Sequence, residues 1–421
     1  MNTKACKGSL ISVLFAILIV SIIYQSGSVQ AANNPDDLLF QVTRILMLIM
    51  PIIMCFFSGG RCNHQFLKGL LLITIIVELL ALINFFLYSE SAVKLQFKIL
   101  NLVLFLLAIH IAEQSSVNML LILYKILIWI AVITLVFYVA VDLIHIPLPY
   151  SIFSKSQGGT FTYRNYFNIY YTYSHARIPR LCGLFWEPGA YQIYLNLGLF
   201  LYYKLNIENK KHLFILLISV FFAQSTTGYM IAVIMLALIV IRKQKNYAYT
   251  LNVIRILGGI CAVAIVLIAF MYKKSVTNVA GDSYFDRIAQ TKLGLELFVE
   301  NPIFGWGFYN TDKYNLLNKA GVGNANGLVT WLYTTGLVGF VFAFFPFITN
   351  IRKTKNENLK VEKIIWLVFL IIENMSEPFY ALPITIFILA KEYYPLIESY
   401  KRKPYKQRKK SDYLNAIGKE Q

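Results

Sequence analysis

The chain contains few charged residues for its length. Of its 421 residues, 14% are charged and 57% are hydrophobic, whereas soluble domains carry about 25% charged residues. A soluble protein so poor in charge could not cover its own surface with polar groups. The composition therefore excludes an ordinary water-soluble enzyme and indicates that a lipid bilayer is a principal solvent of this chain.

Acidic residues are scarcer than basic ones, with 21 Asp and Glu against 39 Lys and Arg and a net charge of +18. Seven of the positive charges lie in the ten-residue stretch 401–410, and most of the others lie between apolar runs. This distribution is typical of signals that orient membrane helices and of contacts with anionic lipid headgroups. It argues against nucleic acid as a partner.

Cysteine and histidine are equally sparse, with five residues of each scattered along the chain. Neither a C-x-x-C nor an H-E-x-x-H pattern occurs, so no disulfide framework and no metal-ligand spacing is indicated. We therefore expect no metal and no cofactor.

The apolar runs predict an all-α polytopic membrane protein with about 12 transmembrane helices, since one crossing needs about 20 apolar residues. Runs that fit a single crossing are 9–25, 38–57, 70–89, 95–113, 119–141, 189–205, 251–272 and 327–349. Two longer runs, 213–241 and 364–390, are interrupted by polar or helix-breaking residues at 224–228 and 373–378. Such backbone is tolerated at depth only where protein or a water-filled cavity surrounds it.

Orientation favours reading each interrupted run as a hairpin. Two hairpins place the basic residues around 242–245 and 352–363 on the cytoplasmic side, together with both termini. The first run resembles a secretory signal ending at Val29-Gln30-Ala31, but we favour an uncleaved first helix. The predicted organisation is helices 1–5 in 1–141, a first external loop in 142–188, helices 6–9 in 189–272, a second external loop in 273–326, helices 10–12 in 327–394 and a basic cytoplasmic tail in 395–421.

The first external loop ends with Arg177, Arg180 and Glu187, just before a membrane helix. Guanidinium groups match phosphate oxygens in geometry and stay charged near lipid, so these arginines are candidates for binding a phosphorylated lipid. Alternatively, they anchor the loop to headgroups. Glu187 is either a base for a hydroxyl group or a favourable charge at a helix N-terminus.

Further candidates lie in the second loop and in the interrupted runs. Arg287 precedes N-P-I-F-G-W-G-F at 301–308, where glycines beside Trp306 permit tight turns. Tyr173 belongs to a group of loop tyrosines that form either an interfacial belt or a stacking surface for sugars. A carboxylate in hydrocarbon costs about 2.5–3.5 kcal/mol, so we expect Glu377 at the external tip of its hairpin.

These motifs, in this order, resemble the O-antigen and capsule repeat-unit polymerases, which share a superfamily with the O-antigen ligases. The resemblance rests on R-I-P-R-L-C-G-L-F-W-E-P-G at 177–189, Q-S-T-T-G at 224–228, the segment 287–308 and N-G-L-V-T-W-L-Y-T-T-G-L-V-G at 326–339. Ligases typically carry His-Asn where this chain has Ala325-Asn326, which favours a polymerase. The R-x10-G loop motifs of some polymerases are not matched at Arg177, Arg180 or Arg287.

The resemblance implies an inverting, metal-independent glycosyltransferase of the bacterial inner (plasma) membrane with its active site on the external, periplasmic face. It would transfer the growing chain from undecaprenyl pyrophosphate to the non-reducing end of a new lipid-linked repeat unit. Partners would be that lipid-linked oligosaccharide, membrane lipids and a chain-length regulator. The expected catalytic residues are Arg180, Arg287 and Glu187, and the expected substrate contacts are Arg177, Tyr173, Trp306, Asn326 and Glu377. The alternatives are a flippase or other transporter of the same lipid, and a ligase.

Reporter fusions test this topology. We expect fusions within 142–188 and 273–326 to report an external location, and a fusion at 353–357 to report a cytoplasmic one, because the basic residues between spans hold the latter segment inside. A cytoplasmic location of either long loop would contradict the topology and favour a transporter.

Overall fold

A computed structural model describes residues 3–33, 36–59, 63–88, 92–156, 160–173, 179–243, 283–308, 310–318, 324, 326–380 and 382–399. The helices are α1 (Thr3–Gln25), α2 (Val29–Asn33), α3 (Leu38–Ser58), α4 (His64–Tyr88), α5 (Ala92–Gln114), α6 (Met119–Phe137), α7 (Pro188–Lys204), α8 (Lys210–Ala223), α9 (Thr226–Lys243), α11 (Ser283–Glu300), α12 (Asp312–Leu317), α13 (Gly327–Lys353), α14 (Glu357–Ser376) and α15 (Pro383–Ser399). The π-helix η1 (Tyr138–Leu143) continues α6, and the strands are β1 (Ser151–Ser156), β2 (Thr160–Tyr166) and β3 (Tyr170–Tyr173).

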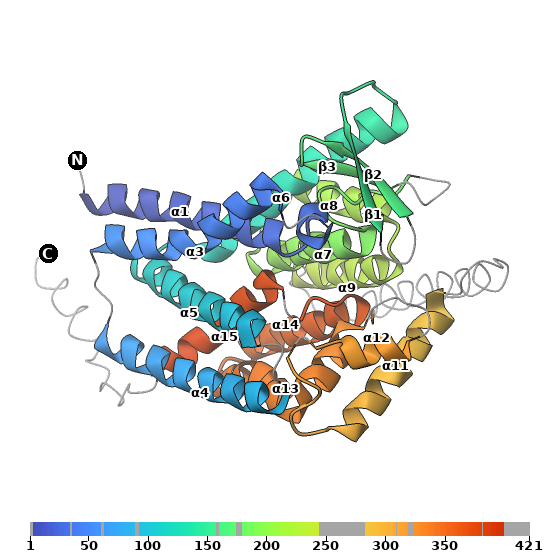
Figure 1. Ribbon diagram of the computed structural model, residues 1–421. Coiled ribbons are helices and arrows are strands. Elements are labelled where there is room, and N and C mark those ends of the chain that lie inside the picture. The colour runs from blue at the N-terminus through green and yellow to red at the C-terminus, as the bar shows by residue number, and fades with distance from the viewer. Residues whose placement is uncertain are drawn as a thin grey trace, which may run out of the picture.

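The chain is an all-α polytopic membrane protein, as the apolar runs predict (Figure 1). Six helical segments among the described residues are long and apolar enough to cross a membrane: Gly8–Gln25, Leu38–Ser58, His64–Tyr88, Leu95–Gln114, Met119–Leu143 and Gly327–Lys353. The run predicted at 251–272 lies outside the described residues.

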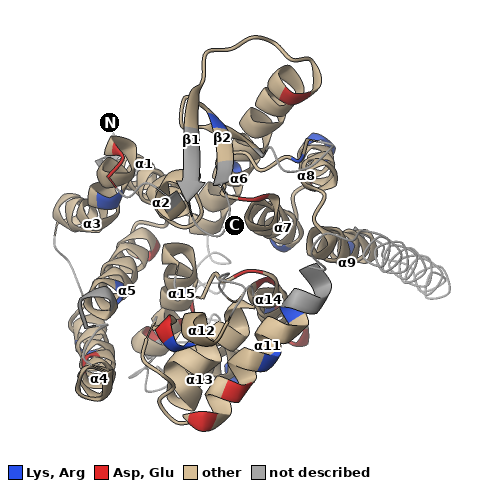
Figure 2. Ribbon diagram, turned by 45° about the vertical axis from the view of Figure 1, so that its right-hand side comes forward, with Lys and Arg blue, Asp and Glu red and all other residues tan. Residues whose placement is uncertain are grey.

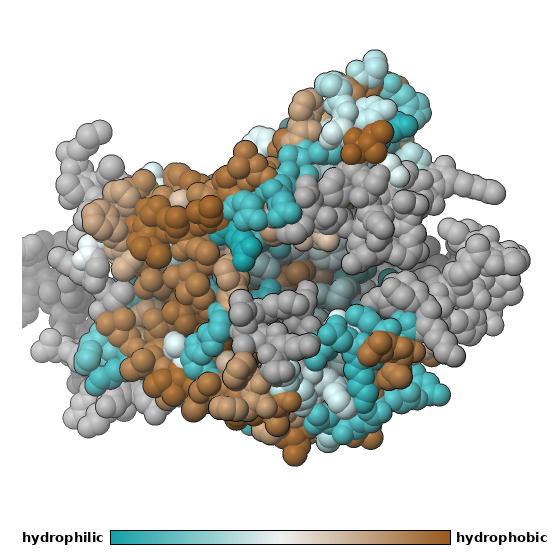
Figure 3. All heavy atoms as spheres, in the orientation of Figure 1, coloured by the Kyte–Doolittle hydropathy of each residue, from teal (hydrophilic) through white to brown (hydrophobic). Residues whose placement is uncertain are grey.

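One side of the molecule presents apolar side chains to its surroundings. On α3, Val42, Ile45, Ile49 and Ile52 are exposed, and their spacing of three or four residues places them on one helix face. Figure 3 shows hydrophobic surface over this side and hydrophilic surface around α11. An apolar surface of this extent would be a liability in water, but it suits contact with lipid.

The helix α7 lies at the centre and is buried from Ala190 to Tyr202. It packs against α6, α8, α9 and α14. Its sequence is apolar on nearly every face, as expected of a helix surrounded by protein. Pro188 occupies the first turn, where a missing backbone N–H leaves no hydrogen bond unmade.

The first interrupted run forms a hairpin of two helices, α8 and α9. The helix α8 begins a short loop after α7 ends, and Arg242 near the end of α9 donates from Nη1 to the carbonyl oxygen of Tyr203, at 2.7 Å. Both open ends of the pair therefore lie beside the C-terminal end of α7. The turn between them places Gln224 in the left-handed region, at a φ of 50°. The predicted break in 213–241 is confirmed.

The second interrupted run, 364–390, is also a hairpin, formed by α14 and α15. Lys363 near the start of α14 donates to the carbonyl oxygen of Asn350, at 3.3 Å, and Asn350 Nδ2 donates to the carbonyl oxygen of Glu392 near the end of α15, at 2.8 Å. These contacts bring both open ends of the hairpin to the C-terminal end of α13. The turn at 377–382 therefore lies at the opposite end of the molecule.

The segment after α1 is part of the folded core. The backbone N–H of Val29 donates to the carbonyl oxygen of Leu184, at 3.0 Å, and that of Ile384 donates to Ser26 Oγ, at 2.8 Å. Ser26 and Val29 are fully buried. The segment after α1 thus joins the first long loop to the start of α15.

The first long loop contains a feature that its sequence did not reveal, an antiparallel sheet in the order β1-β2-β3. Tyr163 in β2 and Tyr170 and Tyr171 in β3 are buried, and the Tyr163 hydroxyl donates to the carbonyl oxygen of Trp186, at 2.8 Å. Neither an interfacial belt nor a sugar-stacking surface suits side chains with so little exposure. Both interpretations are wrong for these three tyrosines, which instead fasten the sheet to the end of the loop.

Two glycines allow the second long loop to cross α13 with backbone against backbone. Gly336 interrupts α13 with a φ of 63°, and a Cβ on Gly305 would lie 2.6 Å from the carbonyl oxygen of Tyr333. That same carbonyl accepts a hydrogen bond of 2.8 Å from the backbone N–H of Trp306. The tight turns predicted for the Gly-Trp-Gly segment are present, with positive φ at Gly305 and Gly307.

We expect Gly336→Ala to lower the free energy of unfolding by about 2–5 kcal/mol. Its backbone conformation is nearly restricted to glycine, and the added methyl would overlap the carbonyl of Ile303. Gly59→Ala is the matched control, because Gly59 has a φ of 82° with nothing within 4 Å and should cost only about 1–2 kcal/mol. Thermal unfolding in detergent measures both, and equal losses would contradict the crossing.

Candidate functional site

The carboxylate of Glu187 stands at the entrance of the central helix. Glu187 is the N-cap residue of α7 in extended conformation, but its side chain makes no capping hydrogen bond. Its Oε1 instead accepts a hydrogen bond of 3.0 Å from Trp186 Nε1. The Glu187 side chain therefore does not cap the N-terminus of α7.

Glu377 meets Glu187 at this point. It follows α14 directly, is 4% exposed, and lies within hydrogen-bonding reach of Glu187. The side chain passes over Gly189, where a Cβ would overlap Glu377 Oε1. Figure 2 shows the acidic segments of α7 and α14 next to each other. Gly189 is thus required by a close approach of two segments far apart in the sequence.

Arg287 brings the second long loop to the same place. Its Nη2 lies 3.9 Å from Glu377 Oε1, and its Nη1 donates to the carbonyl oxygen of Ser376, at 3.2 Å. The side chain of Arg287 is 47% exposed, whereas that of Glu377 is 6% exposed. The guanidinium therefore covers the buried Glu377 carboxyl on one side and leaves the rest of its own surface exposed.

The surroundings of Glu377 raise the pKa of its carboxyl group. Burial, and next the neighbouring Glu187 carboxylate, raise the pKa of Glu377 well above its ordinary value, although Arg287 opposes the shift. The shift favours the protonated form of Glu377. A protonated Glu377 can donate a hydrogen bond to Glu187, which also accepts one from Trp186.

A second polar group lies deeper, along the face of α7 toward α14. Glu373, 2% exposed, accepts hydrogen bonds from Gln192 Nε2 at 2.9 Å and from Asn196 Nδ2 at 3.2 Å. Gln192 and Asn196 are four residues apart and so share one helix face. Two amides at this spacing inside an apolar helix were the signal that could have added them to the predicted site residues.

The Q-S-T-T-G segment forms the wall behind this network. A Cβ on Gly228 would lie 3.0 Å from Gln192 Cβ and 3.2 Å from Gln192 Oε1. The first turn of α9 therefore packs directly on α7, and Ser225 Oγ accepts from the backbone N–H of Gly228, at 3.4 Å. The Ser and Gly of this motif serve close packing of two helices.

Arg180 is directed at the turn between α8 and α9. Its Nε donates to the carbonyl oxygen of Ala223, at 3.3 Å, and its Nη2 donates to that of Gln224, at 3.0 Å. Gln224 Nε2 in turn donates to the carbonyl oxygen of Pro179, at 3.3 Å. A cation at the C-terminal carbonyls of a helix is favourable, so Arg180 has a structural contact that its sequence context did not indicate.

Two other predicted contacts are engaged within the second loop. Asn326 caps α13 by accepting from the backbone N–H of Val329, at 3.1 Å. Trp306 Nε1 donates to the carbonyl oxygen of Leu297, at 2.8 Å, and Lys313 Nζ lies 3.4 Å above its ring. Trp306 thus holds its segment on α11 and α12, and Asn326 holds the start of α13.

The remaining predicted contacts are not described at side-chain level. Arg177 lies outside the described residues, and of Tyr173 only the backbone, in β3, is described. Within the described part of the chain, no group of three or more His, Cys, Asp or Glu residues could hold a metal ion.

Fold and site define a multi-pass membrane protein in which two long loops meet at a buried acidic cluster. Residues 212–344 match the model of a family described as O-antigen ligase. This match supports the O-antigen polymerase and ligase superfamily, and with it a part in assembling surface polysaccharide, without separating the two activities. No curated protein and no solved structure matches the chain.

The raised pKa of Glu377 predicts a stability that falls as pH rises. Above the ordinary pKa of Glu, the unfolded chain has lost this proton while the folded protein retains it, so folding takes up a proton. We expect the melting temperature of the wild type to fall between about pH 5 and pH 8. Glu377→Gln, which stays neutral in both states, should make this dependence shallower than in the wild type.

The matched control is Glu357→Gln, since the Glu357 side chain is 78% exposed and should leave the pH dependence as in the wild type. Parallel melting curves for wild type and Glu377→Gln across this range would show that Glu377 does not retain a proton in the folded state.

Proposed function

We propose that the protein polymerises lipid-linked oligosaccharide repeat units. It transfers the growing chain from undecaprenyl pyrophosphate to the non-reducing end of a new lipid-linked repeat unit, as an inverting, metal-independent glycosyltransferase. The proposal is supported by the superfamily match at 212–344 and by the motif order along the chain, and it places the reaction on the external face of the inner membrane.

The observation that carries this proposal is the meeting of Glu187, Glu377 and Arg287. One comes from the end of the first long loop, one from the turn of a hairpin and one from the second long loop. A transfer between two lipid-linked saccharides needs a base for the acceptor hydroxyl and a cation for the departing pyrophosphate. The cluster supplies both kinds of group side by side.

The proposed step is a single displacement. The acceptor hydroxyl oxygen attacks the anomeric carbon of the donor from the face opposite the pyrophosphate, and the bond from that carbon to the pyrophosphate oxygen breaks. The hydroxyl proton passes to Glu187, and the bonding electrons leave with the pyrophosphate. Glu377, holding its own proton against Glu187, keeps that acceptor oriented, and Arg287 stabilises the charge that develops on the leaving group.

The arginines of the first loop have different proposed roles. Arg180 fixes the turn between α8 and α9, and that turn packs on the face of α7 that carries Gln192. We therefore assign Arg180 to positioning the site. Arg177 remains a proposed contact of the substrate phosphates, and Tyr173, Trp306 and Asn326 remain proposed contacts of the saccharide side of the site.

A ligase is the second candidate, favoured by the description of the matching family. It would use the same donor and differ in its acceptor. Ala325 occupies the position where ligases typically carry a His, and this favours the polymerase. Purified protein given only lipid-linked repeat units separates the two, since a polymerase produces a ladder of products and a ligase produces none without its own acceptor.

We expect Arg287→Ala to lower the rate of ladder formation by about 10²–10³, the usual loss for one donor that stabilises a transition state. Its thermal stability should change little, because the side chain is half exposed. Arg180→Ala should lose rate together with stability, since it leaves the C-terminal carbonyls of α8 without their cation.

Lys292→Ala is the control on the same helix, because Lys292 is 78% exposed and pairs with Glu296 on α11. Its ladder should match that of the wild type at equal protein level. A normal ladder from Arg287→Ala would remove that arginine from the proposed site.

A further inference from the structure

An apolar pocket lies between four helices and the second loop. It has a cavity volume of about 140 Å³. A dry apolar cavity of about 150 Å³ is enough to bind a benzene-sized group. The pocket is lined from α4, α5, α13 and α15 and from the 304–308 segment. Three of these helices contain candidate membrane spans, so its ligand would come from the bilayer.

The residues that line the pocket become less polar from the loop side to the deep end. On α4 it runs from Asn84 to Val77, and on α5 from Leu95 to Leu102, which is about 10 Å at 1.5 Å per residue. The end near Asn84 adjoins the second long loop, because the hydroxyl of Tyr88 donates to the carbonyl oxygen of Gly305. The deep end is apolar on every helix. The pocket is therefore shaped for an apolar chain that enters from the loop side.

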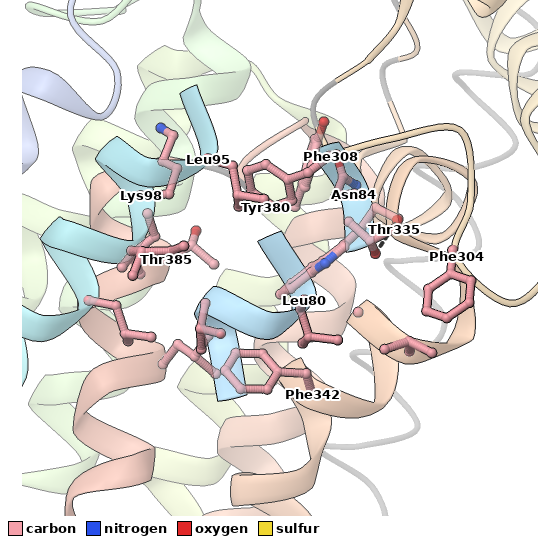
Figure 4. A pocket seen from close by; sticks show the side chains of 18 residues that line it. Leu80, Asn84, Leu95, Lys98, Phe304, Phe308, Thr335, Phe342, Tyr380 and Thr385 are labelled. Atoms are coloured by element: carbon pink, nitrogen blue, oxygen red, sulfur yellow. Dashed lines mark hydrogen bonds between the residues drawn. The ribbon is translucent and has the colours of Figure 1, made fainter. Parts of the chain in front are cut away.

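Positive charge gathers near the loop-side end. Lys98 lines the pocket there, and Arg44 on α3 lies close enough to Lys98 for their charges to interact. The Arg44 guanidinium lies 4.5 Å from the centre of the Phe97 ring. Figure 4 shows Lys98 at one rim with Tyr380 and Phe308 across from it, and Phe342 at the opposite end. Cations at the mouth of an apolar pocket suit a lipid with an anionic head.

The pocket and the acidic cluster are linked by one short segment of chain. Tyr380 lines it and follows Glu377 by three residues in the same turn. Trp331, another lining residue, lies with its ring centre 6.0 Å from that of Tyr380. At the start of the same helix, Gly327 packs against the carbonyl of Glu377, 2.5 Å from where its Cβ would be. The segment that carries Glu377 therefore also supplies a residue to the pocket lining.

We propose that this pocket binds the proximal isoprene units of the polyprenyl diphosphate that carries the saccharide, with Lys98 facing the diphosphate and the rest of the chain in the bilayer. This assignment rests on the proposed function for the identity of the lipid. The shared turn at 377–380 selects the polyprenyl carrier over a bulk phospholipid, because it joins the pocket to the residues proposed for the transfer itself.

Photolabelling of the full-length protein in nanodiscs tests the assignment without turnover. The probe is a photoreactive polyprenyl diphosphate that carries no sugar. We expect labelled peptides from 95–102 and 331–342, and about a 10-fold loss of labelling in Val338→Phe and in Ile99→Phe, which fill the pocket from two helices. Leu337→Phe is the control, since Leu337 is 48% exposed and does not line the pocket.

The role of Lys98 has its own comparison. Lys98→Gln should weaken labelling by the diphosphate about 10-fold yet leave labelling by a photoreactive polyprenol unchanged, and Lys98→Arg should restore the diphosphate signal. Labelling outside the pocket, undiminished labelling of Val338→Phe and Ile99→Phe, or equal competition by phosphatidylglycerol would each overturn the proposal. Correct labelling in a protein that forms no ladder would instead refute the polymerase and leave the pocket standing.

Discussion

The structure depends on the enclosure of carboxyl groups inside a largely apolar helix bundle. A buried charge is tolerated only where it is paired, hydrogen-bonded or neutralised, and each carboxyl here uses a different solution. Glu373 takes two amide donors from α7, Glu377 keeps a proton against Glu187, and Arg287 covers the pair from outside. Because the partners come from separate segments, satisfying these groups requires both long loops and both hairpins to meet at one end of α7.

The hairpins make that meeting possible. A helix that crossed the full membrane at 213–241 or 364–390 would carry its polar middle through hydrocarbon. By turning back at Gln224 and at 377–382, the chain places those polar segments at the loop-side end of the molecule and leaves the basic residues at the other end. The same geometry that spares the cost of burying polar backbone also assembles the candidate site and opens the pocket beside it.

Much of this architecture could be predicted from the sequence. Hydropathy predicted the all-α membrane fold, and the polar interruptions predicted the two breaks, because both depend on local composition. The small sheet was missed, since its tyrosines alternate weakly and their burial depends on contacts with the distant Trp186. Likewise, the capping contact of Arg180 with α8 depends on a turn more than 40 residues away, which no local pattern encodes.

The candidate site was predicted only in part, because some of its contacts depend on distant segments of the chain. Glu187, Glu377 and Arg287 stood out as charges in unusual places, whereas Gln192 and Asn196 looked like ordinary polar residues until Glu373 lay opposite them. Trp306 and Asn326 were prominent in the sequence, yet the Trp306 side chain bonds to α11 and that of Asn326 caps α13.

The crossing at Gly305 and Gly336 limits the substitutions that can accumulate in this part of the chain. The backbone of the other segment fills the space beside each glycine. A side chain at either position would therefore require that backbone to move away. The substitutions that the chain can accept at Gly305 and at Gly336 therefore depend on each other.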